Sequence, residues 1–348
     1  MTVYIGVDFH ARQQTISYLT TEDGAIQELV LLHEEPAAVR AFYEQFAGQR
    51  VVVGFESSGY AAWFEELLEE LGCEIWIGHA AYIRQFAKRR QKNDRRDAEL
   101  ILELLHTGDF PRIHRYSRST RAMLQQLRYR QRLVKMRTMA MNMLLFMASS
   151  RGVSMRTQLQ SKRGQARLAQ LPLPQPLATQ RDELLNLLQT LDQKISTIER
   201  WLEEQTKEDV AVQRLQTHPG IGLLTSICIR YTLEDAARFA NTRKVSAFAG
   251  FDPMQDQSDE RQRMGAISKQ GSRWMRFYLV EAGQTARRKD ADLARLYKRL
   301  SLRRGHAKAK VAVARRLLVR AFIMLRDEID YAEFQRRGVA ARSSRGTA

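Results

Sequence analysis

Four carboxylates stand where the sequence could support metal-dependent chemistry. Asp8 ends the apolar run "VYIGVD", and Glu56 ends the apolar run "VVVGFE". Asp94 and Asp97 begin an amphipathic segment, and their spacing of three places both on one side of a helix. A carboxylate is rarely buried at the end of a strand unless it is paired or bound to a metal ion.

Oxygen ligands of this kind suit Mg²⁺, and two such ions about 4 Å apart serve phosphoryl transfer on DNA or RNA. We therefore predict that the four acids hold Mg²⁺, with two ions as the expected number. Taken singly, each acid also fits a simpler role. Asp8 fits a turn, Glu56 fits the first turn of a helix, and Asp94 fits an N-cap with Asp97 as its partner.

The first 110 residues must position these acids. They predict the element order β-β-β-α-β-α-β, followed by a helix from Asp94 to about His106. Strands are expected at residues 3–8, 15–20, 25–32, 51–56 and 73–78, and the first two helices at 35–48 and 59–72. Antiparallel strands followed by strands that alternate with helices are typical of the α/β RNase H-like fold. In that fold, acids at the ends of these strands and at the start of this helix lie together. Helix-capping preferences do not predict such a grouping.

The charge of the chain indicates a polyphosphate partner. The formal net charge is +17, and the isoelectric point is about 10.2. Residues 1–80 hold 3 basic and 13 acidic side chains, whereas residues 81–170 hold 21 basic and 5 acidic side chains. Because each neutralised phosphate releases counterions, such basic blocks favour nucleic acid over a generally soluble basic protein.

Cysteine content and hydropathy indicate the compartment. Cys73 and Cys228 are the two cysteines, which argues against a disulfide framework or a thiolate zinc site and fits a reducing cytosol. No apolar run reaches membrane-spanning length, and the N-terminus lacks the pattern of a signal peptide. We expect a cytoplasmic, nucleoid-associated protein of bacterial type that does not enter the membrane.

The middle of the chain predicts long helices. Residues 117–150 read as one basic helix, and residues 151–180 as a linker. A heptad pattern follows, made of Leu184, Leu188, Leu191, Ile195, Ile198 and Leu202. Its 4-3-4-3-4 spacing predicts a dimerising coiled coil. A core helix of the same chain is the alternative.

Two further features concern nucleic acid. Gly220 and Gly222 lie in "PGIG" between two predicted helices, as in a helix-hairpin-helix whose backbone N–H groups approach phosphates. A tight helical turn would use the same residues. Arg95 and Arg96 lie beside the acidic pair and could contact substrate phosphates, although a solvated helix face is the simpler interpretation. The tail from Arg336 is expected to be disordered.

Six segments, taken in order, resemble the DEDD transposases of bacterial insertion sequences. They are "IGVDFHA", "FESSGY", "KNDRRDAELI", "PGIG", "FAGFDP" and "ISKQGSRWMR", and the likeness runs from Val3 to about Leu325. That family includes the bridge-RNA-guided recombinases and the Piv-type DNA invertases. The resemblance implies a RuvC-like N-terminal domain, a linking coiled coil and a smaller transposase domain. It assigns the four DEDD positions to Asp8, Glu56, Asp94 and Asp97.

The resemblance also implies a serine nucleophile shortly after the "AGFDP" segment, and the matching residue is Ser258. A serine oxygen stores the energy of the broken phosphodiester as a phosphoserine, whereas water would only cut the strand. In the family, glycine usually follows this serine, whereas Asp259 and Glu260 follow it here. Ser268 and Ser272 lie nearby, but a helix cap and a helix-surface hydroxyl explain them.

Backbone contacts to nucleic acid are assigned to two basic groups. The first is the helix between Arg112 and Arg151, with Arg128 and Arg132 as candidates. The second group consists of Arg263, Lys269, Arg273 and Arg276.

The sequence therefore predicts four regions. Residues 1–110 form the RuvC-like DEDD domain, 111–206 the basic helix, linker and coiled coil, 207–330 the mainly α transposase domain, and 331–348 a basic tail. The predicted activity is Mg²⁺-dependent, site-specific recombination between donor and target DNA by a homodimer or tetramer, guided by a noncoding RNA. A RuvC-like junction nuclease that uses water and a non-catalytic nucleic-acid-binding protein are the alternatives.

Overall fold

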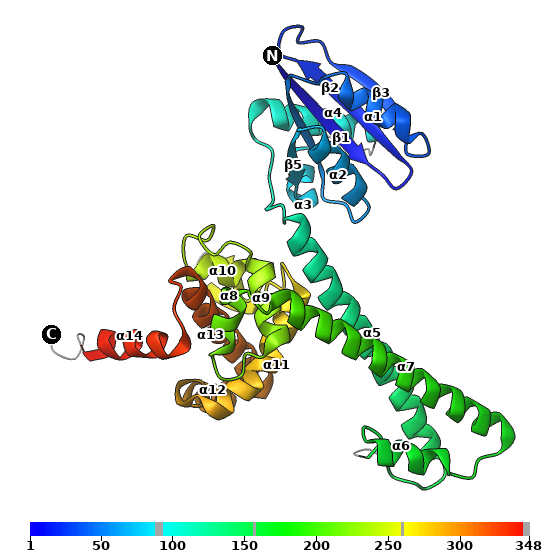
Figure 1. Ribbon diagram of the computed structural model, residues 1–348. Coiled ribbons are helices and arrows are strands. Elements are labelled where there is room, and N and C mark those ends of the chain that lie inside the picture. The colour runs from blue at the N-terminus through cyan, green and yellow to red at the C-terminus, as the bar shows by residue number, and fades with distance from the viewer. Residues whose placement is uncertain (88–92, 156–157, 259–260, 344–348) are drawn as a thin grey trace. The chain divides into compact units, whose positions relative to one another are not determined.

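The computed structural model describes residues 1–87, 93–155, 158–258 and 261–343, with 255–258, 261–264 and 339–343 described by their backbone. It consists of two compact units, Met1–Arg115 and Tyr116–Ala348 (Figure 1). Asp259 and Glu260 lie outside the described residues. The domain boundaries expected at residues 110, 206 and 330 stay predictions.

The first unit is built on a five-stranded mixed sheet. Its strands are β1 (Thr2–Phe9), β2 (Gln13–Thr20), β3 (Gln27–Leu32), β4 (Arg50–Glu56) and β5 (Glu74–Gly78), in the spatial order β3-β2-β1-β4-β5. The pairs β1–β2 and β2–β3 are antiparallel, and β1–β4 and β4–β5 are parallel. The helices of this unit are α1 (Pro36–Glu44), α2 (Ala62–Glu70), α3 (Ala80–Ile83), the 3₁₀ turn η1 (Arg84–Phe86) and α4 (Asp94–Thr107). This order and connectivity are compatible with the expected RNase H-like fold.

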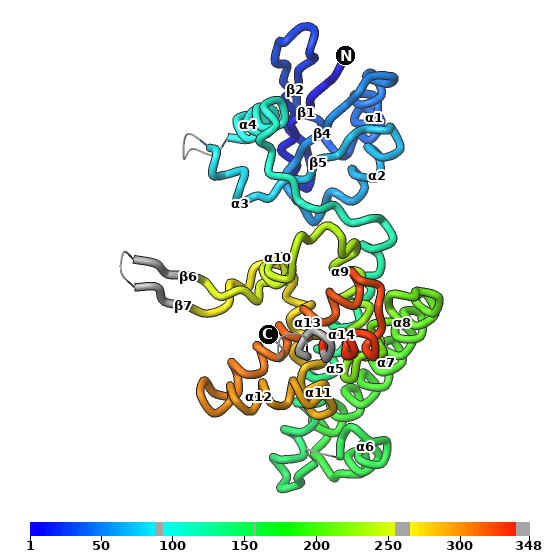
Figure 2. The backbone as a smooth tube through the Cα atoms, turned by 90° about the vertical axis from the view of Figure 1, so that its left-hand side faces the viewer, coloured from blue at the N-terminus to red at the C-terminus, as the bar shows by residue number. Residues whose placement is uncertain are grey.

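The two faces of the sheet differ because successive side chains of a strand point to opposite sides. Val3, Ile5 and Val7 of β1 pack into one core cluster together with residues of α1 and α2. Tyr4 and Val52 belong to a second cluster, which includes residues of α4. Figure 2 shows α4 on one side of the sheet and α1 and α2 on the other. Asp8 shares the alternation of Tyr4, so it belongs to the face that α4 covers.

A pair of glycines lets α4 lie directly on the sheet. Gly6 of β1 and Gly54 of β4 are register partners on adjacent parallel strands. A Cβ atom at Gly6 would stand 2.5 Å from the backbone oxygen of Ala98 and 2.5 Å from the backbone nitrogen of Leu102. A Cβ atom at Gly54 would stand 2.7 Å from the Leu105 side chain. The missing side chains therefore set the depth at which α4 packs.

The second unit is mostly helical. Its elements are α5 (Arg118–Ser149), α6 (Lys162–Ala169), α7 (Gln175–Thr206), α8 (Val210–Gln216), α9 (Leu223–Leu233), α10 (Thr242–Phe248), β6 (Pro253–Ser258), β7 (Arg261–Ile267), α11 (Arg273–Lys289), α12 (Ala291–Arg304), α13 (His306–Arg326) and α14 (Tyr331–Ser343). The segment 151–180, which we expected to be a linker, thus contains α6. None of the described helices has an apolar stretch sufficient to span a bilayer.

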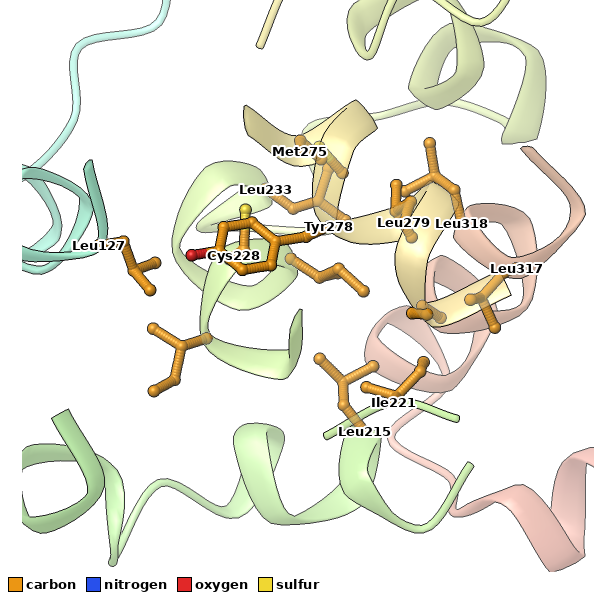
Figure 3. Packing of buried hydrophobic residues seen from close by; sticks show 14 of the residues in the cluster. Leu127, Leu215, Ile221, Cys228, Leu233, Met275, Tyr278, Leu279, Leu317 and Leu318 are labelled. Carbon is orange, nitrogen blue, oxygen red and sulfur yellow. The ribbon is translucent and has the colours of Figure 1, made fainter. Parts of the chain in front are cut away.

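Helices far apart in sequence share one core in this unit. Figure 3 shows Leu127 of α5, Cys228 of α9 and Leu317 of α13 converging on the same packed centre, with Tyr278 of α11 between them. The core thus joins the long helix α5 to the C-terminal helices, which explains why the basic helix belongs to this unit rather than standing alone.

The heptad seam of α7 is buried inside the chain. The long helices α5 and α7 lie side by side (Figure 1). Leu188, Leu191, Ile195, Ile198 and Leu202 are all buried without any second chain. This burial within one chain fits the alternative of a core helix, and dimerisation through α7 stays a prediction. A repeating 3-4 spacing specifies the packing geometry but not whether the partner helix belongs to another chain.

A buried polar network ties the end of the chain to the second unit. Arg320 donates to Asp290 at 2.7 Å, and the side chains are only 8% and 3% exposed. The Tyr331 hydroxyl donates to the same carboxylate, and the His218 ring packs at a tilt against the Tyr331 ring, with 4.4 Å between the ring centroids. These contacts anchor the start of α14 at Tyr331, and disorder beyond Arg336 stays a prediction.

We predict that Gly6→Ala destabilises the first unit by about 2 kcal/mol, because the new methyl group meets the rigid backbone of α4. Gly54→Ala should cost less, since the Leu105 side chain has rotamer freedom. Urea unfolding of the purified protein measures both. Gly59→Ala is the control, because no atom lies within 4 Å of its Cβ position. Equal midpoints for Gly6→Ala and Gly59→Ala would contradict the packing argument.

Candidate active site and nucleic-acid contacts

Asp8 lies near the end of β1 and is largely shielded from solvent, with its side chain 15% exposed. Its Oδ2 atom is 3.0 Å from Nε2 of His10. The same His10 nitrogen is 3.6 Å from Oδ2 of Asp94, the first residue of α4. Ligand atoms of Asp8, His10 and Asp94 all lie within 4.8 Å of one another, a grouping that could hold a metal ion.

Glu56 and Asp97 belong to the same region. A cavity of about 850 Å³ is lined by Asp8, Glu56 and Asp97, among other residues. The parallel register that pairs Val7 with Phe55 brings the ends of β1 and β4 together, which explains why Asp8 and Glu56 share this cavity. The structure thus brings the four acids to one edge of the sheet. Their roles in metal binding stay predictions.

The electrostatics of Asp8 reflect this crowding. Burial raises the pKa of Asp8 above its ordinary value, and the neighbouring carboxylates of Asp97 and Asp94 raise it further. His10 opposes this effect and lowers the pKa of Asp8. A site in which neighbouring carboxylates raise the pKa of Asp8 favours a divalent cation, because the cation removes the repulsion that protonation of Asp8 otherwise relieves.

The simpler roles considered for the acids do not describe the structure. Asp8 lies within β1, and Glu56 is the last residue of β4 rather than part of a helix. The N-cap of α4 is Asn93, whose side chain accepts from the backbone N–H of Arg95. Asp94 is therefore not the N-cap of α4, and Asp97 is not the partner of an N-cap at Asp94.

His10 is a site residue that the sequence analysis did not single out. It lies two residues beyond Asp8, and the period of two in an extended chain would have placed both on one face. The segment "DFHA" contained this signal. As a ligand, an imidazole nitrogen suits first-row transition metals, whereas carboxylate oxygens suit Mg²⁺.

Arg84 pairs with Glu56, at 3.6 Å between Nη2 and Oε1. Arg95 and Arg96 are both exposed, and Arg95 Nε lies 3.8 Å from Oε2 of Glu28. Their exposure agrees with the solvated helix face that the sequence favoured, and phosphate contact by either residue stays a prediction.

Ser258 is the last residue of β6 and is the register partner of Arg261 in β7. The root of this hairpin is held by main-chain bonds between the segments "AGFDP" and "SKQG". The backbone N–H of Ser268 donates to the carbonyl of Asp252 at 2.8 Å, and that of Lys269 donates to the carbonyl of Gly250 at 3.2 Å. The two segments that carried the resemblance therefore position the strand that ends at Ser258.

Arg276 has a structural role rather than a free cationic head. Its Nη1 donates to the carbonyl oxygens of Ala249, Gln270 and Gly271 at 2.9, 3.0 and 3.3 Å. Burial lowers the pKa of Arg276 from its ordinary value. Through Nη1 the guanidinium clamps the hairpin root, and contact of Arg276 with nucleic acid stays a prediction.

The other members of this basic group differ. Lys269 and Arg273 are exposed, whereas Arg263 is the register partner of Asp256 within the hairpin. The Ser268 hydroxyl donates to Asp252, and Ser272 caps α11, in agreement with structural roles for both serines.

The remaining candidates lie on α5 and around α9. Arg128 and Arg132 are exposed one turn apart on α5. Gly220 has a φ of +99°, and a Cβ atom there would lie 2.5 Å from the backbone nitrogen of Ala286, so packing against α11 requires glycine. Gly222 is exposed and is the N-cap residue of α9. Gly222 is thus the member of this pair whose backbone is open to a phosphate.

We predict that Arg276→Ala lowers the unfolding free energy by about 2 kcal/mol, because three carbonyls lose a charged donor. Arg273→Ala is matched in charge and lies on the same helix, but its head is exposed, so its effect should stay within about 0.5 kcal/mol. Thermal unfolding compares the two. Similar losses in both variants would refute the clamp.

Comparisons with known proteins agree with this architecture. Residues 5–147 match the DEDD transposase model of IS110 elements, and residues 212–298 match the transposase IS116/IS110/IS902 family. The chain is 28% identical over 258 residues to a probable family 20 transposase of Pseudomonas aeruginosa, covering 71% of this chain and 74% of that protein. It is 29% identical over 240 residues to the transposase for insertion sequence element IS1328 of Yersinia enterocolitica, covering 67% and 70%. It is 28% identical over 276 residues to the transposase for insertion sequence element IS1111A of Coxiella burnetii, covering 75% and 74%. The chain therefore belongs to the DEDD transposases of the IS110/IS116/IS902 family, which are DNA-cutting enzymes.

Proposed function

We propose that this transposase breaks and rejoins DNA strands through a divalent-metal site formed by Asp8, Glu56, Asp94 and Asp97, and through a nucleophile, Ser258. The observation that carries the proposal is the grouping of Asp8, His10 and Asp94 beside the cavity that Asp8 shares with Glu56 and Asp97. Four carboxylates from three separate elements meet there, and a protein that only binds polyanions gains nothing from such a cluster.

The donor set fits Mg²⁺, because carboxylate oxygens are its usual protein ligands. When bound, two Mg²⁺ ions would neutralise the phosphate and stabilise the attacking and leaving oxygens. Asp8 and Glu56 offer oxygens from neighbouring strand ends, and Asp94 and Asp97 offer oxygens from α4. His10 orients the Asp8 carboxylate through their 3.0 Å contact, or supplies a nitrogen ligand.

Ser258 would give the reaction its recombinase character. Its Oγ loses a proton and forms a bond to phosphorus while the bond from phosphorus to the departing strand breaks, and the departing oxygen takes a proton. A hydroxyl of the second strand then attacks the phosphoserine and releases Oγ. Support comes from the location of Ser258 within the segment that matches the transposase family, and from the motif contacts at the hairpin root.

The proposal includes a structured noncoding RNA as guide and a homodimer or tetramer as the active form. The net charge of +17 supports a second polyanionic partner besides DNA. The exposed Arg128 and Arg132 of α5 provide backbone contacts that carry no sequence information, which is consistent with target choice by base pairing.

Replacement of an acid should remove catalysis without removing DNA binding. We predict that Asp8→Asn and Asp97→Asn each reduce strand cleavage by roughly 10³-fold with Mg²⁺ present, because each removes a metal ligand. Glu99→Gln is the control, since it changes one charge at an exposed position of the same helix α4. Cleavage of a labelled donor duplex measures the rate. Full activity of Asp97→Asn would refute the proposed site.

Ser258→Ala should abolish a covalent protein–DNA adduct, because a methyl group cannot form the phosphoserine. The adduct is detected as labelled DNA that migrates with denatured protein. Ser268→Ala and Ser272→Ala should retain it, since these hydroxyls bond to Asp252 and cap α11. If Ser258→Ala cuts and rejoins DNA like the parent enzyme, water or another group is the nucleophile, and the junction-nuclease alternative gains.

A further inference from the structure

A basic groove lies between α12, α13 and α14, away from every residue assigned above. Its volume is about 860 Å³, and four arginines line it: Arg295 and Arg299 from α12, and Arg316 and Arg320 from α13. We call it the α12–α14 groove. Helices α13 and α14 lie beyond residues 5–147 and 212–298, which the two family models match.

The charges of the groove are not balanced. Two acids, Asp290 and Asp292, also line it. Arg320 pairs with Asp290 at 2.7 Å and approaches Asp292 at 3.6 Å, and Arg295 pairs with Asp292. Both acids therefore already face guanidinium groups, and the groove retains an excess of positive charge.

Arg299 and Arg316 carry that excess. Both are exposed, and neither has an ion-pair partner among the residues that the structure describes. Both line the groove, Arg299 from α12 and Arg316 from α13. Each unpaired guanidinium group can bind phosphate oxygens in a bidentate manner.

Buried polar contacts and aromatic rings form the floor and the third wall of the groove. Asp290 and Arg320 are almost fully buried, and the Tyr331 hydroxyl also donates to Asp290. Phe334 of α14 stacks on Tyr331, with 6.4 Å between the ring centroids and 15° between the planes. The groove therefore presents aromatic side chains beside its arginines.

We infer that the α12–α14 groove binds the phosphodiester backbone of a single nucleic-acid strand, with Arg299 and Arg316 on the phosphates and Phe334 beside a base. A positive groove lined by aromatic side chains is the arrangement by which proteins hold single strands without reading their sequence. The inference uses only the fact that the enzyme acts on nucleic acid, and it does not depend on which residues cut.

The test is binding of the full-length protein to labelled strands in EDTA, where cleavage cannot interfere. Single-stranded RNA, single-stranded DNA and duplex DNA of one sequence are compared by fluorescence anisotropy. Arg299→Ala combined with Arg316→Ala should weaken single-strand binding by roughly 10-fold. The slope of log K against log salt should fall by about 1.4, or roughly 0.7 per lost phosphate contact.

The control is Arg303→Ala combined with Arg304→Ala, which removes the same charge from exposed positions at the end of α12 that do not line the groove. It should weaken binding by less than about 2-fold. Phe334→Leu should weaken single-strand binding by roughly 5-fold while leaving the salt slope unchanged, because stacking is lost and not charge. Circular dichroism verifies the fold of each variant.

Loss of binding to the RNA strand, the DNA strand or both supports the groove and identifies its ligand. Equal losses in the two double variants would show that bulk charge alone is responsible, and a loss confined to duplex DNA would show that the ligand is not a single strand. Either result overturns the inference. Because the assay contains no metal, neither result bears on the site at Asp8.

Discussion

The close approach of α4 to strand β1 is the contact on which the candidate site depends. Because Gly6 has no side chain, the backbone of α4 rests on the sheet at Ala98 and Leu102. Asp94 lies one turn before Ala98, Asp97 lies immediately before Ala98, and Asp8 lies two residues beyond Gly6. The distance between α4 and β1 therefore fixes the distances between the acids. Gly6 has no reactive group, but it controls the geometry of the candidate site.

That geometry is electrostatically unfavourable in the free protein. Asp8 is removed from water and faces the carboxylates of Asp94 and Asp97, with His10 as its nearest counter-charge. Folding free energy from the apolar clusters on both faces of the sheet must hold these groups together. Clusters of carboxylates that repel one another are common at cation-binding sites, because the bound cation offsets the repulsion.

The order of strands and helices in the first unit could be predicted from the sequence because alternating apolar residues and glycine-bounded helices give a strong local signal. The helix that packs against the seam of α7 could not be predicted from the sequence. The leucines of this seam specify a helix–helix contact, but only the position of α5, which is set by a distant part of the chain, shows where the partner lies. The contacts of Arg276 could not be predicted from the sequence either. Its charge suggested DNA, whereas the carbonyls that it binds come from residues brought together by the hairpin root. His10 was accessible to sequence reasoning, because the strand period would have aligned it with Asp8.

The hairpin of β6 and β7 is held at its root by bonds between residues outside both strands. Ser268 bonds to Asp252 through its backbone N–H and its hydroxyl, the backbone N–H of Lys269 donates to Gly250, and Arg276 donates to Ala249, Gln270 and Gly271. A substitution near the tip of the hairpin therefore leaves these contacts intact, whereas a substitution at the root would displace both strands together and Ser258 with them.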